Sequence, residues 1–213
     1  MRRAALVQGL VLALIALLLW LLADTTASHL AQRGIRSGFD FLLEPAGFAL
    51  GESPMAFEPA DATWRAFLAG LLNTLRVALP GALLAVLLGI LLGFGRLSDN
   101  PAARSLCGTV VEGIRNLPLL LHLLAWYFIL TDLLPTTEAA FHPAPGLYLS
   151  KSGLALPWWG DTGWEIPEPA GFGIEGGARL TPEYLALLIG LSSYAAAYIT
   201  ETLRGAIGAL PPG

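Results

Sequence analysis

The sequence has little charge and almost no cysteine. Only 13% of its 213 residues are charged, and the single cysteine, Cys107, excludes an intrachain disulfide. The basic residues form no cluster that could follow a phosphate backbone, so nucleic acid is not an expected partner. Instead, 55% of the residues are hydrophobic and the mean hydropathy is +0.64, more than a soluble domain usually carries. This composition indicates an integral membrane protein.

Motifs for enzyme chemistry are absent as well. The sequence contains no HExxH, no GxSxG and no paired cysteines of the zinc type. It also lacks GxxxxGK[ST], because Lys151-Ser152 follows a serine and not a glycine. We therefore expect no enzyme activity, no metal and no cofactor in this chain, and we expect any ATP chemistry to belong to a partner.

Long apolar runs predict an all-α membrane protein with about four transmembrane helices, each run being near the roughly 20 residues that a span needs. The runs cover residues 4–23, 67–94, 117–134 and 182–200. The first is too long for the apolar core of a cleavable signal peptide, so we interpret it as an uncleaved span. Thr181-Pro182-Glu183 predicts the start of the last helix, with a capping hydroxyl, a first-turn proline and a carboxylate at the positive dipole end.

The arginines indicate a topology, because short basic segments stay in the cytoplasm. Arg2 and Arg3 place the N-terminus inside, and Arg96, Arg104 and Arg115 place the polar stretch between the second and third spans inside. The predicted outer segments are residues 24–64 and 135–180, and the inner one is 96–116. The predicted domains are 1–64, a helix with its outer loop, and 65–213, the transmembrane bundle.

The outer insert, residues 135–180, is too polar and too interrupted by glycine and proline to cross a membrane. Trp158, Trp159 and Trp164 give it an aromatic surface that suits the headgroup boundary of the outer leaflet. Membrane lipid is thus an expected partner.

Small residues recur every four positions in the second span. Gly81, Ala85, Gly89 and Gly93 share one helix face, and such faces let another helix approach closely. A plain membrane anchor needs no such face, so the pattern predicts packing within a bundle.

Few polar residues lie at membrane depth, where they are costly and often functional. Asn73, Thr74 and His122 are candidates for the path of a polar solute. For Asn73 and Thr74 the alternative is bonding to backbone or water. For His122 a hydrogen-bonded interior imidazole is the simpler interpretation, and no second ligand stands at metal-binding spacing.

Charged and helix-bending residues near the predicted inner face are candidates for a gate or an interface: Glu112, Arg115, Asn116, Pro118, Glu201 and Arg204. Glu201 and Arg204 lie three residues apart on one helix face and can pair there. The alternative for Glu112 and Arg115 is a mutually neutralising surface pair.

Five segments together resemble the polar amino-acid permeases of bacterial ABC importers: GLLNTL at 70–75, GFGRLSDN at 93–100, VEGIRNLPLLL at 111–121, WY at 126–127 and SYAAAYITETLRGAI at 193–207. Upstream, GFDFL at 38–42, AGF at 46–48 and GES at 51–53 resemble the branch of general L-amino-acid permeases. The resemblance extends over nearly the whole chain. It departs at His122, where the family usually has glutamine, and at Pro212.

The resemblance implies part of a type I ABC importer bundle in the bacterial inner membrane. Its implied partners are an ATP-binding subunit that holds the ATP, a second permease subunit, an extracytoplasmic solute-binding protein and an L-amino acid, which moves inward by alternating access. The family pattern continues after Gly213 with Gln-x-Glu-Ala-Ala, so the resemblance also implies a C-terminally truncated fragment.

Two functions of other classes compete with this interpretation. The chain could be a membrane-anchored structural or assembly protein whose Trp-rich outer loop is the interaction surface. The four-residue spacing of small side chains and the polar Asn73, Thr74 and His122 argue against pure anchoring. A membrane-embedded enzyme is the third possibility, and the missing catalytic cluster disfavours it.

Overall fold

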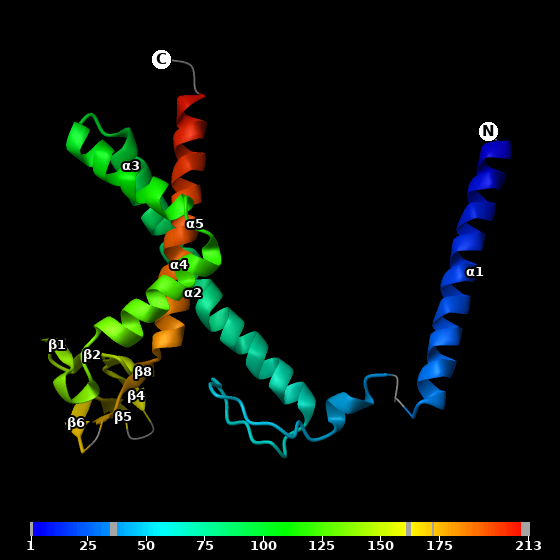
Figure 1. Ribbon diagram of the computed structural model, residues 1–213, viewed down its shortest axis with the longest axis horizontal. Helices are drawn as coiled ribbons and strands as arrows, with labels where there is room; N and C mark the ends of the chain where they lie inside the picture. Colours follow the sequence, from blue (N-terminus) through cyan, green and yellow to red (C-terminus); the bar gives the residue numbers. More distant parts are fainter. Residues whose placement is uncertain (1, 35–37, 161–162, 172, 210–213) are drawn as a thin grey trace. The chain divides into compact units, whose positions relative to one another are not determined.

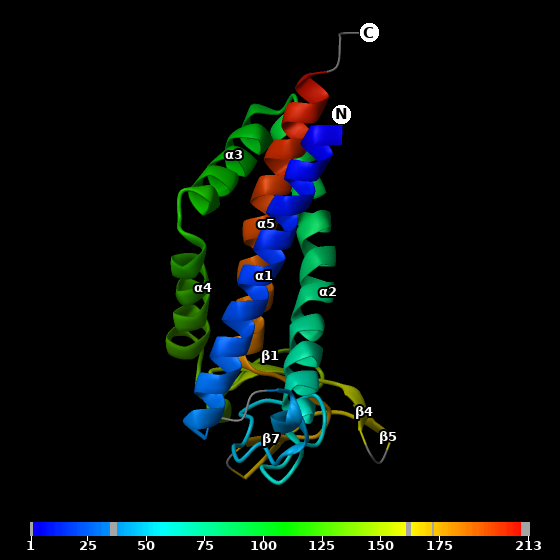
Figure 2. The same cartoon turned by 90° about the vertical axis from the view of Figure 1, so that its right-hand side faces the viewer.

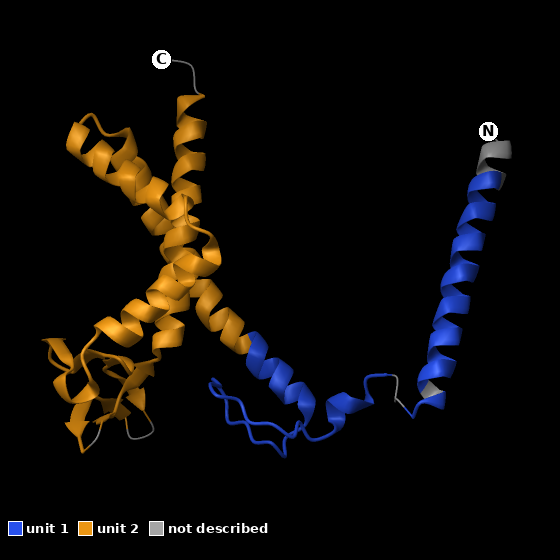
Figure 3. Cartoon of the chain, in the orientation of Figure 1, with its two compact units in different colours: residues 1–71 blue, residues 72–213 orange. Residues whose placement is uncertain are grey.

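The computed structural model describes residues 2–34, 38–160, 163–171 and 173–209, and for residues 2–6 and 31 it describes the backbone alone. The side chains of Arg2 and Arg3, and the residues Pro212 and Gly213, therefore lie outside the described part. The chain divides into two units, residues 1–71 and 72–213 (Figure 3). Each unit is described by itself.

The first unit holds helix α1 (Arg2–Gln32), the 3-10 turn η1 (Asp40–Leu43) and the first turns of α2. The window of α1 from Val7 to Leu30 is exposed along its length, as a helix surrounded by lipid would be. The following loop folds back on itself: the N–H of Ala46 donates to the carbonyl of Asp61 at 2.8 Å. Arg65 pairs with Asp61 at 2.5 Å and so fixes the end of this loop to the start of α2.

The second unit is built around helix α5 (Pro182–Gly208), on which α3 (Pro101–Arg115) and α4 (Leu119–Phe128) pack (Figure 1). A π-helical turn, η2 (Ile129–Leu133), continues α4. Helix α2 (Thr63–Leu97) runs in the same chain direction as α5, because Arg76 meets Tyr184 near the start of α5 and Gly93 meets Leu203 near its end. Helix α4 runs antiparallel to α5, because His122 meets Ser193 while Leu130 packs with Leu185.

Beyond its first turn, the buried residues of α5 are small. Gly190, Ser192, Ala196, Ala197 and Thr200 are all buried, so neighbouring helices approach its backbone closely. The helix begins where the sequence predicts: the Thr181 hydroxyl accepts a hydrogen bond from the N–H of Tyr184 at 3.2 Å, and Pro182 opens the first turn.

Residues 101–115, which the sequence suggests are an inner loop, form the helix α3. Asn100 caps it, its side chain accepting from the N–H of Ala102 at 2.9 Å, and Pro101 fills the first position. Val111 is fully buried, so one face of α3 belongs to the bundle. The stretch predicted as a polar loop is thus a short amphipathic helix.

The outer insert forms small sheets and not irregular chain. Between the 3-10 turn η3 (Thr137–Ala139) and α5 lies a four-stranded antiparallel sheet in the order β1-β2-β3-β8: Phe141–Ala144, Leu147–Ser150, Gly153–Leu156 and Ala178–Leu180. Two hairpins follow β3, namely β4 (Trp158–Gly160) with β5 (Gly163–Glu165), and β6 (Glu168–Ala170) with β7 (Gly173–Glu175). Gly153 is required where β3 meets β8, because its φ of +102° is unfavourable for other residues and a Cβ would collide with the Leu180 carbonyl.

The sheets gather at the N-terminal end of α5 and α3 lies toward its C-terminal end (Figure 2). Leu154 and Leu180 of the sheet pack against Leu130, Tyr184 and Leu185, which form the core at that end. The insert is therefore continuous with the helical bundle.

The predicted all-α membrane class holds for the bundle, since the strands are short and confined to the insert. Among the described residues, α1, α2 and α5 are each long and apolar enough to cross a membrane, and α3 with α4 and η2 would make a fourth span that bends by 105°. The protein is a multi-span membrane protein.

Candidate functional site

Five charged side chains meet where α2, α3 and α5 come together. This ion cluster consists of Arg96 on α2, Glu112 and Arg115 on α3, and Glu201 and Arg204 on α5. Four of them were candidates from the sequence, and the structure brings these four together. Arg96, which the sequence marks only as a sign of topology, joins them as the contribution of α2.

Glu201 is the centre of the ion cluster. Its carboxylate accepts from Arg96, from Arg204 at 2.9 Å, and lies 3.7 Å from the guanidinium of Arg115. Its side chain is 17% exposed and that of Arg96 is 15% exposed, so both charges depend on each other for the solvation that water would otherwise give. The predicted pair of Glu201 and Arg204 is present, and it is one of three contacts.

Glu112 and Arg115 do not neutralise each other in the way the simple surface interpretation expects. Glu112 pairs with Arg96 at 3.2 Å, and Arg115 reaches Glu201 and also lies over the ring of Tyr198, 5.4 Å from its centroid. Glu112 is 64% exposed, so its pair contributes little to stability. The two residues thus connect α3 to two other helices.

Asn116 and Pro118 form the elbow between α3 and α4. Asn116 ends α3, its N–H donating to the carbonyl of Glu112 at 3.0 Å, and Pro118 precedes α4 and accepts from the N–H of His122 at 3.1 Å. The chain turns by 105° here. Asn116 and Pro118 therefore set the direction in which the chain enters α4, whereas the residues of the ion cluster connect helices through their charges.

The small-residue face of α2 lies against α5. A Cβ added at Gly89 would come within 2.7 Å of the Ile199 side chain, and one added at Gly93 would come equally close to Leu203. Gly81 faces Ser192, and Ala85 is 3% exposed. Three of the four residues thus face α5, and the fourth, Ala85, is buried on the same side of α2.

His122 is buried between α4 and α5. Its Nε2 lies 2.9 Å from the Ser193 hydroxyl and receives a hydrogen bond from the indole N–H of Trp126 at 3.3 Å. An indole nitrogen can only donate, so Nε2 is the acceptor in the contact with Trp126. Ser193 and Trp126, which the sequence does not single out as polar partners, complete this site.

Asn73 and Thr74 lie elsewhere. They lie on α2, three and two residues before Arg76, whose carbonyl accepts a hydrogen bond from the Tyr184 hydroxyl in the first turn of α5 at 3.1 Å. His122 meets α5 nine residues further along, at Ser193, which is ~13 Å at the helical rise. The structure therefore does not bring the three polar candidates into one site.

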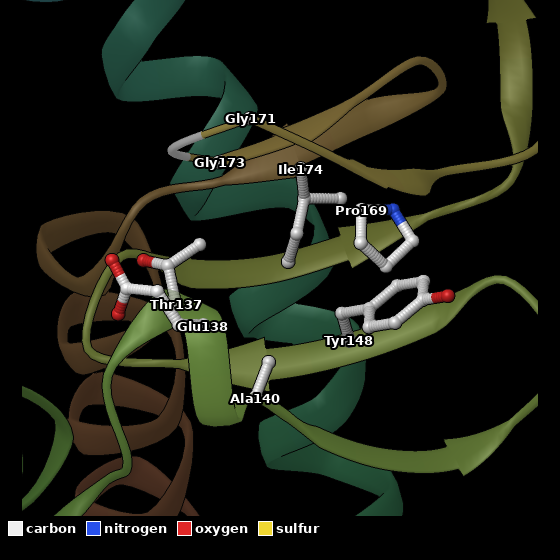
Figure 4. Close-up of a pocket in the computed structure, with 8 residues that line it drawn as sticks. All are labelled: Thr137, Glu138, Ala140, Tyr148, Pro169, Gly171, Gly173 and Ile174. Carbon is white, nitrogen blue, oxygen red and sulfur yellow. The ribbon is translucent and has the colours of Figure 1, made fainter.

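A pocket of about 220 Å³ lies in the outer insert (Figure 4). Its walls include Tyr148, Pro169 and Ile174, whose side chains face one another, with Glu138 at the rim. Hydrogen bonds from its own backbone N–H and from Thr136 hold the pKa of Glu138 below its usual value. Among the described residues, no group of His, Cys, Asp and Glu is arranged to hold a metal ion.

Comparison with known proteins identifies relatives of this chain. The chain is 30% identical to the general L-amino acid transport system permease protein AapQ of Rhizobium johnstonii, over 99% of this chain and 68% of that protein. It is 32% identical to the putative amino-acid ABC transporter permease protein YhdX of Escherichia coli, over 95% of this chain and 67% of that protein. The glutamate transport system permease protein GluD of Corynebacterium glutamicum is 33% identical over 37% of this chain and 30% of its own length.

No protein-family model and no solved structure matches the chain. The two longer alignments nevertheless extend over 99% and 95% of it. The protein belongs to the family of amino-acid ABC transporter permeases.

Proposed function

We propose that this permease subunit forms part of the path by which an ATP-driven importer moves an L-amino acid into the cytoplasm through alternating access. The names of the relatives support the substrate class, since AapQ is named for general L-amino acid transport and GluD for glutamate transport. Bacterial inner membrane is the proposed location, with the N-terminus and the ion cluster on the cytoplasmic side.

The ion cluster is the observation that carries this proposal. A transporter that alternates between two arrangements needs contacts that exist in one arrangement and break in the other. Glu201 gathers guanidinium groups from α2 and α3 as well as from α5, so it holds the ends of three helices together. We interpret this structure as the arrangement closed at that end, and opening would separate Arg96 and Arg115 from Glu201.

The proposed path for the amino acid lies along α5. His122 and Ser193 supply polar groups at an otherwise apolar helix interface, and polar groups at membrane depth mark substrate routes. Asn73 and Thr74 stand near the outer end of α5, where a solute arriving from outside would first meet the bundle. The chain thus has polar positions at two depths.

The proposed partners supply what this chain lacks. An ATP-binding subunit would bind and hydrolyse ATP, the energy source of the whole complex, and so favour one arrangement of the helices over the other. A second permease subunit would complete the pathway, and an extracytoplasmic solute-binding protein would deliver the amino acid on the side of the insert. This chain itself would carry out no hydrolysis.

Uptake measurements in cells test the proposal. Radiolabelled L-amino acids are offered to cells that lack this gene and to cells in which it is restored, both with the companion subunits intact. We expect ATP-dependent accumulation of at least one L-amino acid only in the restored cells. Uptake unchanged by the loss of the gene, or efflux in place of accumulation, would contradict the proposal.

The alternative of an anchored structural protein with a Trp-rich outer surface has one supporting observation. Trp158, Trp159 and Trp164 are 57–70% exposed on the hairpin of β4 and β5. An anchor, however, gives no reason for charges held between three helices at the opposite end of α5. Transport explains both ends, with the hairpin facing lipid or the delivering protein.

A further inference from the structure

A basic cleft lies beside the ion cluster. It has a volume of about 420 Å³, and its walls carry three guanidinium groups, one carboxylate and two hydroxyls: Arg96, Arg104, Arg204, Glu112, Ser105 and Thr109. The cleft opens to the surface between α3 and the ends of α2 and α5. Guanidinium groups and hydroxyls directed into one cleft are donors suited to a phosphate group.

The positive charge of the cleft is only partly neutralised. Glu201 already forms ion pairs with three arginines, and Glu112 forms one with Arg96. Arg104 donates to the backbone carbonyl of Asp99 at 3.3 Å, and within the described part of the chain it forms no ion pair. With Arg115 included, four guanidinium groups stand against two carboxylates. An anion in the cleft would complete the charge balance.

Helix α3 presents an apolar surface next to this cleft. Leu106 is 67% exposed and Val110 is 40% exposed, and they follow Ser105 and Thr109 directly in the sequence. One residue of advance is about 100° around a helix, so the hydroxyl stripe and the apolar stripe are adjacent. The third side of α3 is buried through Val111, and the helix is turned by 105° from the direction of α4.

A short helix with one basic polar side and one exposed apolar side suits the plane between headgroups and acyl chains. Basic pockets between helices at the membrane surface bind the phosphates of anionic lipids. The exposed leucine beside the guanidinium groups favours a lipid over a water-soluble anion, and over an acidic segment of a partner protein, which would leave Leu106 without an apolar neighbour.

We propose that the cleft formed by Arg96, Arg104, Arg204, Ser105 and Thr109 binds the phosphate headgroup of an anionic phospholipid, with its acyl chains along Leu106 and Val110. Arg104 is the residue on which the affinity depends most, because its charge is free for the ligand. Under the proposed topology the lipid belongs to the cytoplasmic leaflet, and the binding itself does not depend on transport.

The experiment is native mass spectrometry of the full chain released from detergent, with phosphatidylglycerol as the anionic lipid and phosphatidylcholine as its neutral counterpart. We expect retained phosphatidylglycerol, at least tenfold less retained phosphatidylcholine, and a loss of phosphatidylglycerol of fivefold or more in Arg104→Gln. Arg179→Gln, an exposed arginine on β8 at the other end of the unit, is the matched control and should retain the lipid as the unaltered chain does. Circular dichroism and gel filtration of both variants confirm that they are folded.

Two further arms separate the sources of the anion. Inorganic phosphate at millimolar concentration should not displace the lipid, and a photoreactive phosphatidylglycerol should label the peptide that contains residues 101–112. Equal retention of the two lipids, equal retention by Arg104→Gln, or displacement by inorganic phosphate would each overturn the proposal.

Discussion

The hydroxyl of Thr200 on α5 donates a hydrogen bond to the backbone carbonyl of Gly89 on α2 at 3.0 Å. Thr200 has no exposed surface, and its hydroxyl also reaches the carbonyl of Ala196 at 2.8 Å. A side chain can bond the backbone of a neighbouring helix only where nothing projects between them. The glycine at position 89 therefore sets the distance between the two helices.

Enlarging Gly89 should separate α2 from α5. In Gly89→Leu the new side chain would overlap Ile199 and the Ala196 carbonyl, and overpacking of this kind costs about 1–3 kcal/mol. We expect a lower melting temperature of the purified protein in detergent. Gly113→Leu, a helical glycine with nothing within 4 Å of an added Cβ, and Leu88→Ile, off the packed face, should melt as the unaltered protein does. Equal melting of Gly89→Leu and Gly113→Leu would refute the packing argument.

The ion cluster predicts an order of destabilisation among conservative substitutions. Glu201→Gln would leave three guanidinium groups around a neutral amide, at a cost of about 3 kcal/mol. Arg96→Gln should cost less, because Glu201 keeps Arg204 and Arg115. Glu112→Gln should cost under about 1 kcal/mol, because that carboxylate is 64% exposed. Thermal unfolding of the three variants side by side measures the order, and a Glu112→Gln effect as large as that of Glu201→Gln would contradict it.

The sequence predicts local features of this fold well and distant contacts poorly. The start of α5 can be predicted from Thr181-Pro182 because caps act within one turn. The small-residue face of α2 can be predicted because residues four apart lie on roughly the same side of a helix. The place of Arg96 in the ion cluster is not predictable from local pattern, because its partner Glu201 lies 105 positions away along the chain.

The strands of the insert could not be predicted from the sequence for another reason. Its strands are three or four residues long and are bounded by glycine and proline, so no alternation of polar and apolar residues is long enough to read. Their pairing is fixed by the ladder itself, for example Leu154 opposite Leu180, and by packing on Tyr184 and Leu185. Tertiary contacts thus decide a structure that local pattern does not.

Cysteine labelling tests the proposed topology. In a Cys107→Ala background, Trp159→Cys places a thiol on the hairpin of β4 and β5, and Gly113→Cys places one on α3; both positions are exposed. A membrane-impermeant maleimide added to whole cells should label the first and not the second, and permeabilisation should make both reactive. Labelling of Gly113→Cys alone in intact cells would mean that the chain has the opposite orientation.

His122 provides the sharpest test of the proposed substrate path. Its Nε2 lies between Ser193 on α5 and Trp126 on α4, and a glutamine side chain at this position would also offer an acceptor and a donor at its end. His122→Gln should therefore retain uptake of radiolabelled L-amino acid within a few-fold of the unaltered protein. His122→Leu, of similar bulk but without polar atoms, would leave Ser193 and the Trp126 indole N–H without this partner and remove a polar group from the path, so we expect uptake to fall at least tenfold. A melting curve is measured for each variant, because replacing a purely structural histidine would lower stability and uptake together. Uptake is then compared at a temperature where both variants are folded. If His122→Leu melts at a lower temperature but transports at the unaltered rate there, His122 is a packing residue and the path lies elsewhere along α5.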